Sequence, residues 1–167
     1  MSSSQGHWAF NCREDRWIFN SRGDLRVGLK RLRGGEMHSR YKEFKFSLDL
    51  PPGSEAMVLV REFLREFSSG YPGRLLDLNF ACRSSDTVSA TELALAISEV
   101  ATQVRSIALA VNLAGGIEPL LDVLRRMRSL ESFQQNDPSL CRSSSDAVAL
   151  AHCLATLPSL KSVEMQP

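Results

Sequence analysis

The chain has 167 residues, of which 43% are hydrophobic and 23% charged, and its formal net charge is +1 at pH 7. This length suffices for one domain with a sizeable core, and no apolar run approaches the roughly 20 residues of a membrane span. The N-terminus lacks a secretory signal and the four cysteines form no Cys-x-x-Cys pair, so we expect a cytoplasmic protein, with the nucleus as the alternative, and neither disulfides nor metal.

The charge is divided unevenly along the chain. Residues 1–45 carry a net charge of +5, and the remainder carries −4. Residues 1–7 are rich in serine, which predicts a disordered N-terminus. In residues 8–43, period-2 patterning over 8–19 predicts a short hairpin, and a strand or short helix is expected over 25–32. We interpret residues 8–43 as a basic N-terminal cap, because the first turn of a stacked fold needs a cover.

Residues 44–167 alternate between two apolar periods. Period-2 patterning predicts strands over residues 46–50, 75–79, 106–110, 131–134 and 161–165. Apolar spacings of three and four predict helices over residues 56–67, 91–103 and 147–157, and another after the turn at Gly115 and Gly116 with Pro119 near its start. Asp146 is the predicted N-cap of the last helix.

The strands recur at a nearly constant interval. Taking Leu76, Ile107, Phe133 and Val163 as equivalent positions gives intervals of 31, 26 and 30 residues. One strand and one helix cannot bury their own apolar faces, so neighbouring units must stack. The sequence therefore predicts an α/β fold of about four to five stacked units over residues 44–167.

Two segments resemble leucine-rich repeats of the ribonuclease-inhibitor type. Residues 150–165 are similar to that family's helix-to-strand segment, and residues 104–112, which read Val-x-x-Ile-x-Leu-x-x-Asn, are similar to its strand. The chain departs from the family's pattern at Ala81 and Pro138, where Asn is expected, and at Gln135, where a second apolar residue is expected. The resemblance implies a short leucine-rich-repeat solenoid with parallel strands on its concave side, helices on its convex side, and an N-terminal cap.

In this family the concave strand face binds partner proteins, which implies a protein-interaction scaffold. The residue between the two core residues of each strand faces that surface. By the predicted alignment these residues are Asp49, Asp77, Ala108, Gln134 and Glu164. Three of the five are acidic, so we expect a mildly acidic docking surface for a basic partner protein.

No pattern in the chain points to catalysis or to a cofactor. His152 is tied to no carboxylate or serine by spacing and is expected on the surface, whereas Cys153 is expected in the core. The basic run Lys30–Arg33 lacks interleaved aromatic residues and the sequence pI is about 7.7, so nucleic acid is an unlikely partner. We therefore expect no enzyme activity, no metal, no cofactor and no membrane association.

Two alternatives to the scaffold remain open. Alternating strands and helices also fit a doubly wound α/β domain that binds a ligand or acts as an enzyme. The chain also fits a subunit of a larger assembly, completed by self-association or by a partner at its C-terminal edge. Val163 and Met165 carry this second alternative, because no later element is predicted to cover them.

Overall fold

The computed structural model describes residues 16–19, 22–34, 43–49, 54–82, 86–136 and 140–165. In this part of the chain, six strands form one parallel sheet: β1 (Arg16–Phe19), β2 (Glu43–Asp49), β3 (Leu75–Ala81), β5 (Val104–Ala110), β7 (Ser132–Gln135) and β8 (Ser162–Met165). Their spatial order, β1-β2-β3-β5-β7-β8, is their order in the chain. The predicted α/β class with a parallel sheet is confirmed.

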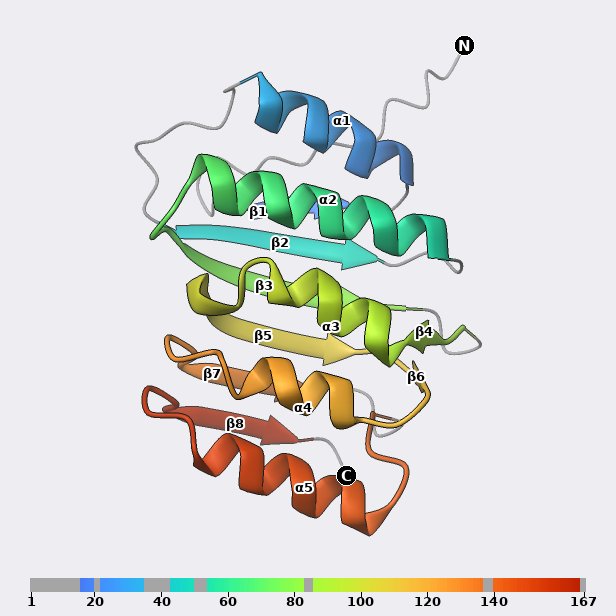
Figure 1. Ribbon diagram of the computed structural model, residues 1–167, viewed down its shortest axis with the longest axis vertical. Helices are drawn as coiled ribbons and strands as arrows, with labels where there is room; N and C mark the ends of the chain where they lie inside the picture. Colours follow the sequence, from blue (N-terminus) through green and yellow to red (C-terminus); the bar gives the residue numbers. More distant parts are fainter. Residues whose placement is uncertain are drawn as a thin grey trace.

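Five α-helices are described: α1 (Arg22–Arg33), α2 (Ser54–Gly70), α3 (Ala90–Ser98), α4 (Glu118–Leu124) and α5 (Ser144–Ala155). They lie side by side in chain order, and all five are on the same face of the sheet (Figure 1). Apolar residues spaced by three and four turn one side of each helix toward the sheet. The opposite face of the sheet carries no helix in the described part of the chain.

The strand β1 lies in the second half of the predicted hairpin. It pairs in parallel with β2, with Trp17 aligned to Phe46. Residues 1–15 lie outside the described residues, so the proposed disorder of residues 1–7 and the first half of the hairpin do too. The division into a cap over residues 8–43 and a body over 44–167 stays a prediction.

The turn before α4 follows the sequence pattern. Gly115 has a φ of 93°, in the left-handed region that favours glycine, and Pro119 lies in the first turn of the helix. A feature that was not predicted lies nearby. β4 (Val88–Ser89) and β6 (Leu113–Ala114) pair in parallel and form a small second sheet that joins the chain segments after β3 and β5.

The prediction of Asp146 as the N-cap is wrong, because α5 begins at Ser144, before the apolar residues on which the predicted helix was based. Ser143 is the N-cap, and its hydroxyl accepts a hydrogen bond from the backbone N–H of Asp146 at 3.2 Å. The Asp146 carboxylate in turn accepts from the backbone N–H of Arg142 at 3.2 Å. This pair of hydrogen bonds resembles a capping box, in which the N-cap residue is followed three positions later by an acidic residue whose side chain accepts from a backbone N–H near the cap.

The predicted helix over residues 91–103 is also too long. α3 ends at Ser98, and the chain continues as a 3₁₀ turn over Ala101–Gln103. The reason is Gln103, whose buried side-chain amide donates to the backbone carbonyls of Tyr71 at 2.8 Å and Arg74 at 3.2 Å. The hydroxyl of Ser68 donates to the Gln103 Oε1 at 2.7 Å. These tertiary bonds fix the chain in a conformation that helical spacing alone does not predict.

The core fills the space between the sheet and the helices. Its N-terminal part is aromatic: Phe67 of α2 meets Phe44 and Phe46 of β2 edge-on, with ring centroids 5.1 and 5.2 Å apart, and stacks on Tyr71 at 5.5 Å. Toward the C-terminus the core becomes mainly aliphatic, with Leu and Val predominating. Cys153 is buried in this part, as expected for a small core residue.

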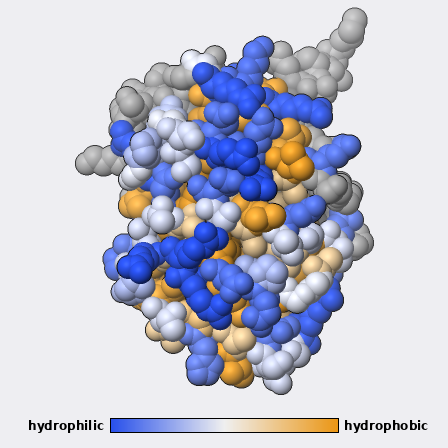
Figure 2. Space-filling model, in the orientation of Figure 1, coloured by the Kyte–Doolittle hydropathy of each residue, from blue (hydrophilic) through white to orange (hydrophobic). Residues whose placement is uncertain are grey.

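The helix face is largely hydrophilic (Figure 2). Ion pairs link neighbouring helices there, such as Arg33 of α1 with Glu62 of α2 at 2.6 Å, and Arg61 of α2 with Glu99 after α3 at 3.0 Å. Exposed pairs of this kind contribute little to stability. The stability of the fold therefore depends mainly on the layer of side chains between the sheet and the helices.

Candidate functional site

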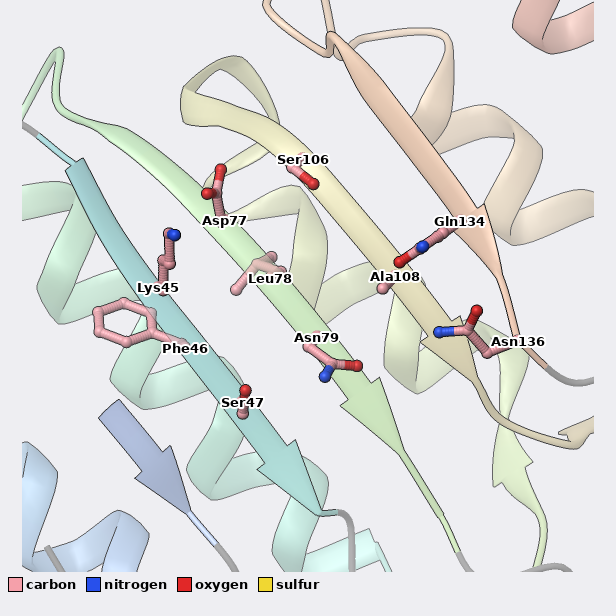
Figure 3. A pocket seen from close by; sticks show the side chains of 10 residues that line it. All are labelled: Lys45, Phe46, Ser47, Asp77, Leu78, Asn79, Ser106, Ala108, Gln134 and Asn136. Atoms are coloured by element: carbon pink, nitrogen blue, oxygen red, sulfur yellow. The ribbon is translucent and has the colours of Figure 1, made fainter. Parts of the chain in front are cut away.

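The helix-free face of the sheet presents the strand residues that alternate with the core residues. We call this surface the open face and define it by Lys45, Ser47, Asp77, Asn79, Ser106, Ala108 and Gln134. Together with Asn136 they line a shallow depression of about 220 Å³ across β2, β3, β5 and β7 (Figure 3). Most of these side chains are small or uncharged and polar, so the surface can donate and accept hydrogen bonds over a broad area.

Strand pairing arranges the open face in rows across the sheet. One row contains Ser47, Asn79, Ala108, Gln134 and Glu164, each aligned with the next. Three of the five predicted site residues, Ala108, Gln134 and Glu164, therefore lie side by side. Ser47 and Asn79 complete the row in the places where Asp49 and Asp77 were predicted.

Asp49 and Asp77 lie in the rows on either side of this one. Asp77 is aligned with Lys45 and Ser106, whereas Asp49 is aligned with Ala81. The cause is the alignment of β3, in which Leu78 rather than Leu76 pairs with Ile107. The predicted equivalence of Leu76 and Ile107 is therefore wrong.

An irregularity in β5 explains part of this shift. Leu76 pairs with Val104 and Asp77 pairs with Ser106, so Arg105 is an extra residue in β5, as in a β-bulge. Arg105 binds the Asp77 carboxylate with two nitrogens, at 2.7 and 3.2 Å, and the two side chains are only 22% and 19% exposed. The planar guanidinium matches a carboxylate in this two-point geometry. Asp77 therefore links β3 to β5. The sequence pattern did not predict that Arg105 would be its partner.

This ion pair changes the expected effect of reversing the charge at Asp77. At an exposed strand position without a partner, a charge reversal would change stability by about 0.5 kcal/mol or less. We expect Asp77→Lys to lower the free energy of unfolding by about 1–2 kcal/mol, between the values for exposed and buried pairs, because a lysine would face Arg105. Urea unfolding of Asp77→Lys measures the loss, and Asp49→Lys, at an exposed position of β2, is the matched control. Equal midpoints for the two variants would contradict the link between the strands.

The charges of the strand face nearly balance, with Asp49 at the exposed carboxyl end of β2 as the carboxylate left over. Lys45 on β2 and Glu164 on β8 lie at its two sides, and Arg105 neutralises Asp77 between them. Glu164 accepts a hydrogen bond from the Gln134 side-chain amide at 2.6 Å. The surface is therefore polar and close to neutral at its centre, rather than acidic throughout.

The loops at the carboxyl ends of the strands are tied by a cysteine and an asparagine. The Cys82 sulfur accepts from the backbone N–H of Asn112 at 3.4 Å and donates to the Asp86 carbonyl at 3.6 Å. The Asn112 side-chain oxygen accepts from Arg142 at 3.1 Å. Cys82 thus ties the chain segment that follows β3 to the segment that follows β5.

Two cysteine thiols and the possible metal ligands of the described residues bear on whether the protein can catalyse a reaction. Burial raises the pKa of the Cys153 and Cys141 thiols, which disfavours the reactive thiolate. His152 is exposed, as expected. In the described ranges, no three His, Cys, Asp or Glu side chains gather as metal ligands would, and no helix there is long and apolar enough to cross a bilayer.

No family model matches the chain, and no curated protein or solved structure shows significant similarity to it. The open face is therefore judged by its geometry and chemistry. It is broad, shallow and polar, whereas small-molecule sites are typically deep and mostly apolar. These properties fit contact with a macromolecule better than enclosure of a small ligand.

Proposed function

We propose that the protein is a non-catalytic scaffold of the leucine-rich-repeat, ribonuclease-inhibitor-like type that binds a partner protein across the open face. The observation that carries this proposal is the placement of all five described helices on one face of a sheet whose strands follow chain order. The core then needs only one helical layer, and the other face of the sheet is left to a partner. Stacked strand–helix architectures use their extended strand face in this way.

The strand order favours the scaffold over a doubly wound α/β domain. In a doubly wound sheet the strand order reverses at a switch point, where ligands bind, and helices cover both faces. Neither feature occurs among the described strands and helices. A sheet buried on both faces would also have continuous apolar strands, whereas β3 alternates Leu76, Asp77, Leu78 and Asn79.

The chemistry of the open face suggests what the partner presents. Ser47, Asn79 and Gln134 can exchange hydrogen bonds with a polar segment, and Ala108 between them permits close approach. Lys45 favours an acidic group on one side of the segment, and Glu164 favours a basic group on the other. We therefore propose a polar partner segment that crosses the strands, with its basic group near β8.

The proposal is tested by capturing the partner at a defined position. A photo-crosslinking residue placed at Ala108 should capture one partner protein from the native cell extract, and the same residue at Leu95 of α3, on the helix face, should not. The captured protein is then purified and its affinity for the unmodified chain is measured. Capture of the same protein from both positions would count against the open face.

With the partner in hand, Ala108→Arg is expected to weaken its binding by roughly 100-fold. A long cation at the centre of the interface both blocks close approach and leaves a charge to be desolvated, and hot-spot changes of this kind cost about 2 kcal/mol or more. Leu95→Arg, at an exposed position on the other face, should leave the affinity unchanged. Titration calorimetry measures both variants, and circular dichroism checks their folding. An unaltered affinity for Ala108→Arg would overturn the proposed docking surface.

A further inference from the structure

The C-terminal edge of the sheet exposes strand backbone together with apolar side chains. Among the described strands and helices, β8 pairs with β7 alone and α5 packs beside α4 alone, so both border the same end of the described structure (Figure 1). Every residue of β8 is exposed. The edge therefore presents unpaired backbone groups next to side chains that point toward the helix layer.

Two apolar residues of β8 are exposed, although the residues aligned with them in the neighbouring strands are buried. Val163 and Met165 are 44% and 40% exposed, although they align with Phe133 and Gln135 of β7, which are buried. In β5 the aligned residue Ile107 is fully buried as well. Val163 and Met165 thus occupy core positions that no further strand or helix covers in the described part of the chain.

The helix beside these residues, α5, also exposes a residue whose counterparts in the other helices are buried. α3, α4 and α5 each bury a leucine in the core (Leu93, Leu120 and Leu150). The residue after it is buried in α3 and α4, where it is Ala94 and Leu121, and each of these helices has another helix beside it on its C-terminal side. In α5 the residue after it is Ala151, which is exposed. In the described part of the chain, β8 and α5 therefore both lack a neighbour at the same end.

We propose that a second copy of this chain covers this end, with β8 paired to its own copy in antiparallel orientation and α5 beside the α5 of the partner. An occupant must bring a free strand edge and an apolar helix side at the same level, and the C-terminal end of a second copy brings both. A two-fold axis perpendicular to the sheet keeps the helices of the two copies on one face. The contact closes after two copies, as an isologous interface does.

The charges of β8 fit this pairing when Val163 lies opposite its own copy. Ser162 then faces Glu164 of the partner subunit, and Lys161 faces Met165 of the partner subunit, so no two like charges are directly opposed. A hydroxyl opposite a carboxylate can donate a hydrogen bond to it. On the helix side of the extended sheet, Val163 then lies beside Val163 of the partner subunit, and Met165 lies against the aliphatic stem of Lys161 of the partner subunit. This dimer goes beyond the proposed scaffold function, because its contacts lie along the edge of β8 and share only Glu164 with the docking surface proposed above.

Sedimentation velocity and light scattering on the full chain test the dimer over a concentration series that reaches about 1 mM, which saturates any association with a micromolar Kd. We expect a monomer–dimer equilibrium for the unaltered chain. Val163→Lys should weaken it on the order of 100-fold, because two like charges would lie opposite each other. Leu95→Lys is the matched control, since Leu95 is 43% exposed on α3, and should dimerise normally.

Cysteine cross-linking tests the pairing itself. Val163→Cys should give a disulfide-linked dimer under mild oxidation, because the two-fold axis brings position 163 beside its copy at a distance that a disulfide spans. The unaltered chain and Leu95→Cys should remain uncrosslinked. A strictly monomeric chain at every concentration, growth beyond two copies, or a dimer unaffected by Val163→Lys would each overturn the proposal, and these results leave the open face untouched.

Discussion

Replacing Phe67 by alanine is expected to lower the free energy of unfolding by about 3–5 kcal/mol, the largest single effect we anticipate. Phe67 is fully buried in α2 and touches Phe44, Phe46 and Tyr71, so its removal takes away aromatic contacts on three sides. The cavity would lie between β2 and α2, where rigid rings cannot collapse into it easily. Because domains are typically stable by only about 5–15 kcal/mol, such a loss brings the chain close to unfolding.

Chemical denaturation followed by circular dichroism measures this effect, and the same helix supplies the control. Val58 of α2 is exposed, so Val58→Ala should change the free energy of unfolding by about 0.5 kcal/mol or less. Phe67→Leu should fall between the two variants, because it keeps part of the buried volume. A loss for Phe67→Ala no greater than that for Val58→Ala would mean that the aromatic cluster does not stabilise the fold.

The substitution Gln103→Glu is expected to cost about 2–4 kcal/mol at pH 7. The change preserves shape and the acceptor for Ser68, but it replaces the amide donor to the Tyr71 and Arg74 carbonyls with a second oxygen. A buried carboxylate facing two carbonyls favours its protonated form, so its pKa in the folded state would lie above the unfolded value of about 4.3. Stability relative to the unaltered chain should therefore be nearest normal below about pH 4 and should fall as the pH rises.

Thr102 provides the control for this experiment, because it is the exposed neighbour of Gln103 in the same 3₁₀ turn. Thr102→Ala should change the denaturation midpoint little, and its effect should not depend on pH. If Gln103→Glu were as stable as Thr102→Ala at pH 7, the two carbonyls would not depend on the Gln103 amide.

The class of fold was predictable because two apolar periods alternate along the chain. Period-2 segments became strands, and segments with spacings of three and four became helices. Exact boundaries were not predictable where tertiary bonds decide them. The end of α3 depends on bonds from Gln103 to residues about thirty positions earlier, and the pairing of β4 with β6 depends on two strands that carry only two residues each.

The candidate site was predictable as a face but not as a set of rows. In a strand, a shift of two residues keeps a side chain on the same face and moves it to the next row. Leu76, Leu78 and Phe80 are all buried, so the apolar pattern of β3 fits more than one alignment with β5. The extra residue Arg105 then settles the alignment through pairing, which the sequence does not display. Asp77 was accordingly placed on the correct face and in the wrong row.

Strand pairing in chain order also has a mechanical consequence. The ladders between strands are connected in series from one edge of the sheet to the other, so a tensile load across the sheet passes through every one of them. The ladders β2–β3 and β3–β5 have seven and six aligned pairs, whereas β1–β2, β5–β7 and β7–β8 have four each. Under such a load the longer ladders deform less. Bending and stretching therefore concentrate toward the two edges of the described sheet, and the curvature of the sheet is more compliant there than around β2, β3 and β5.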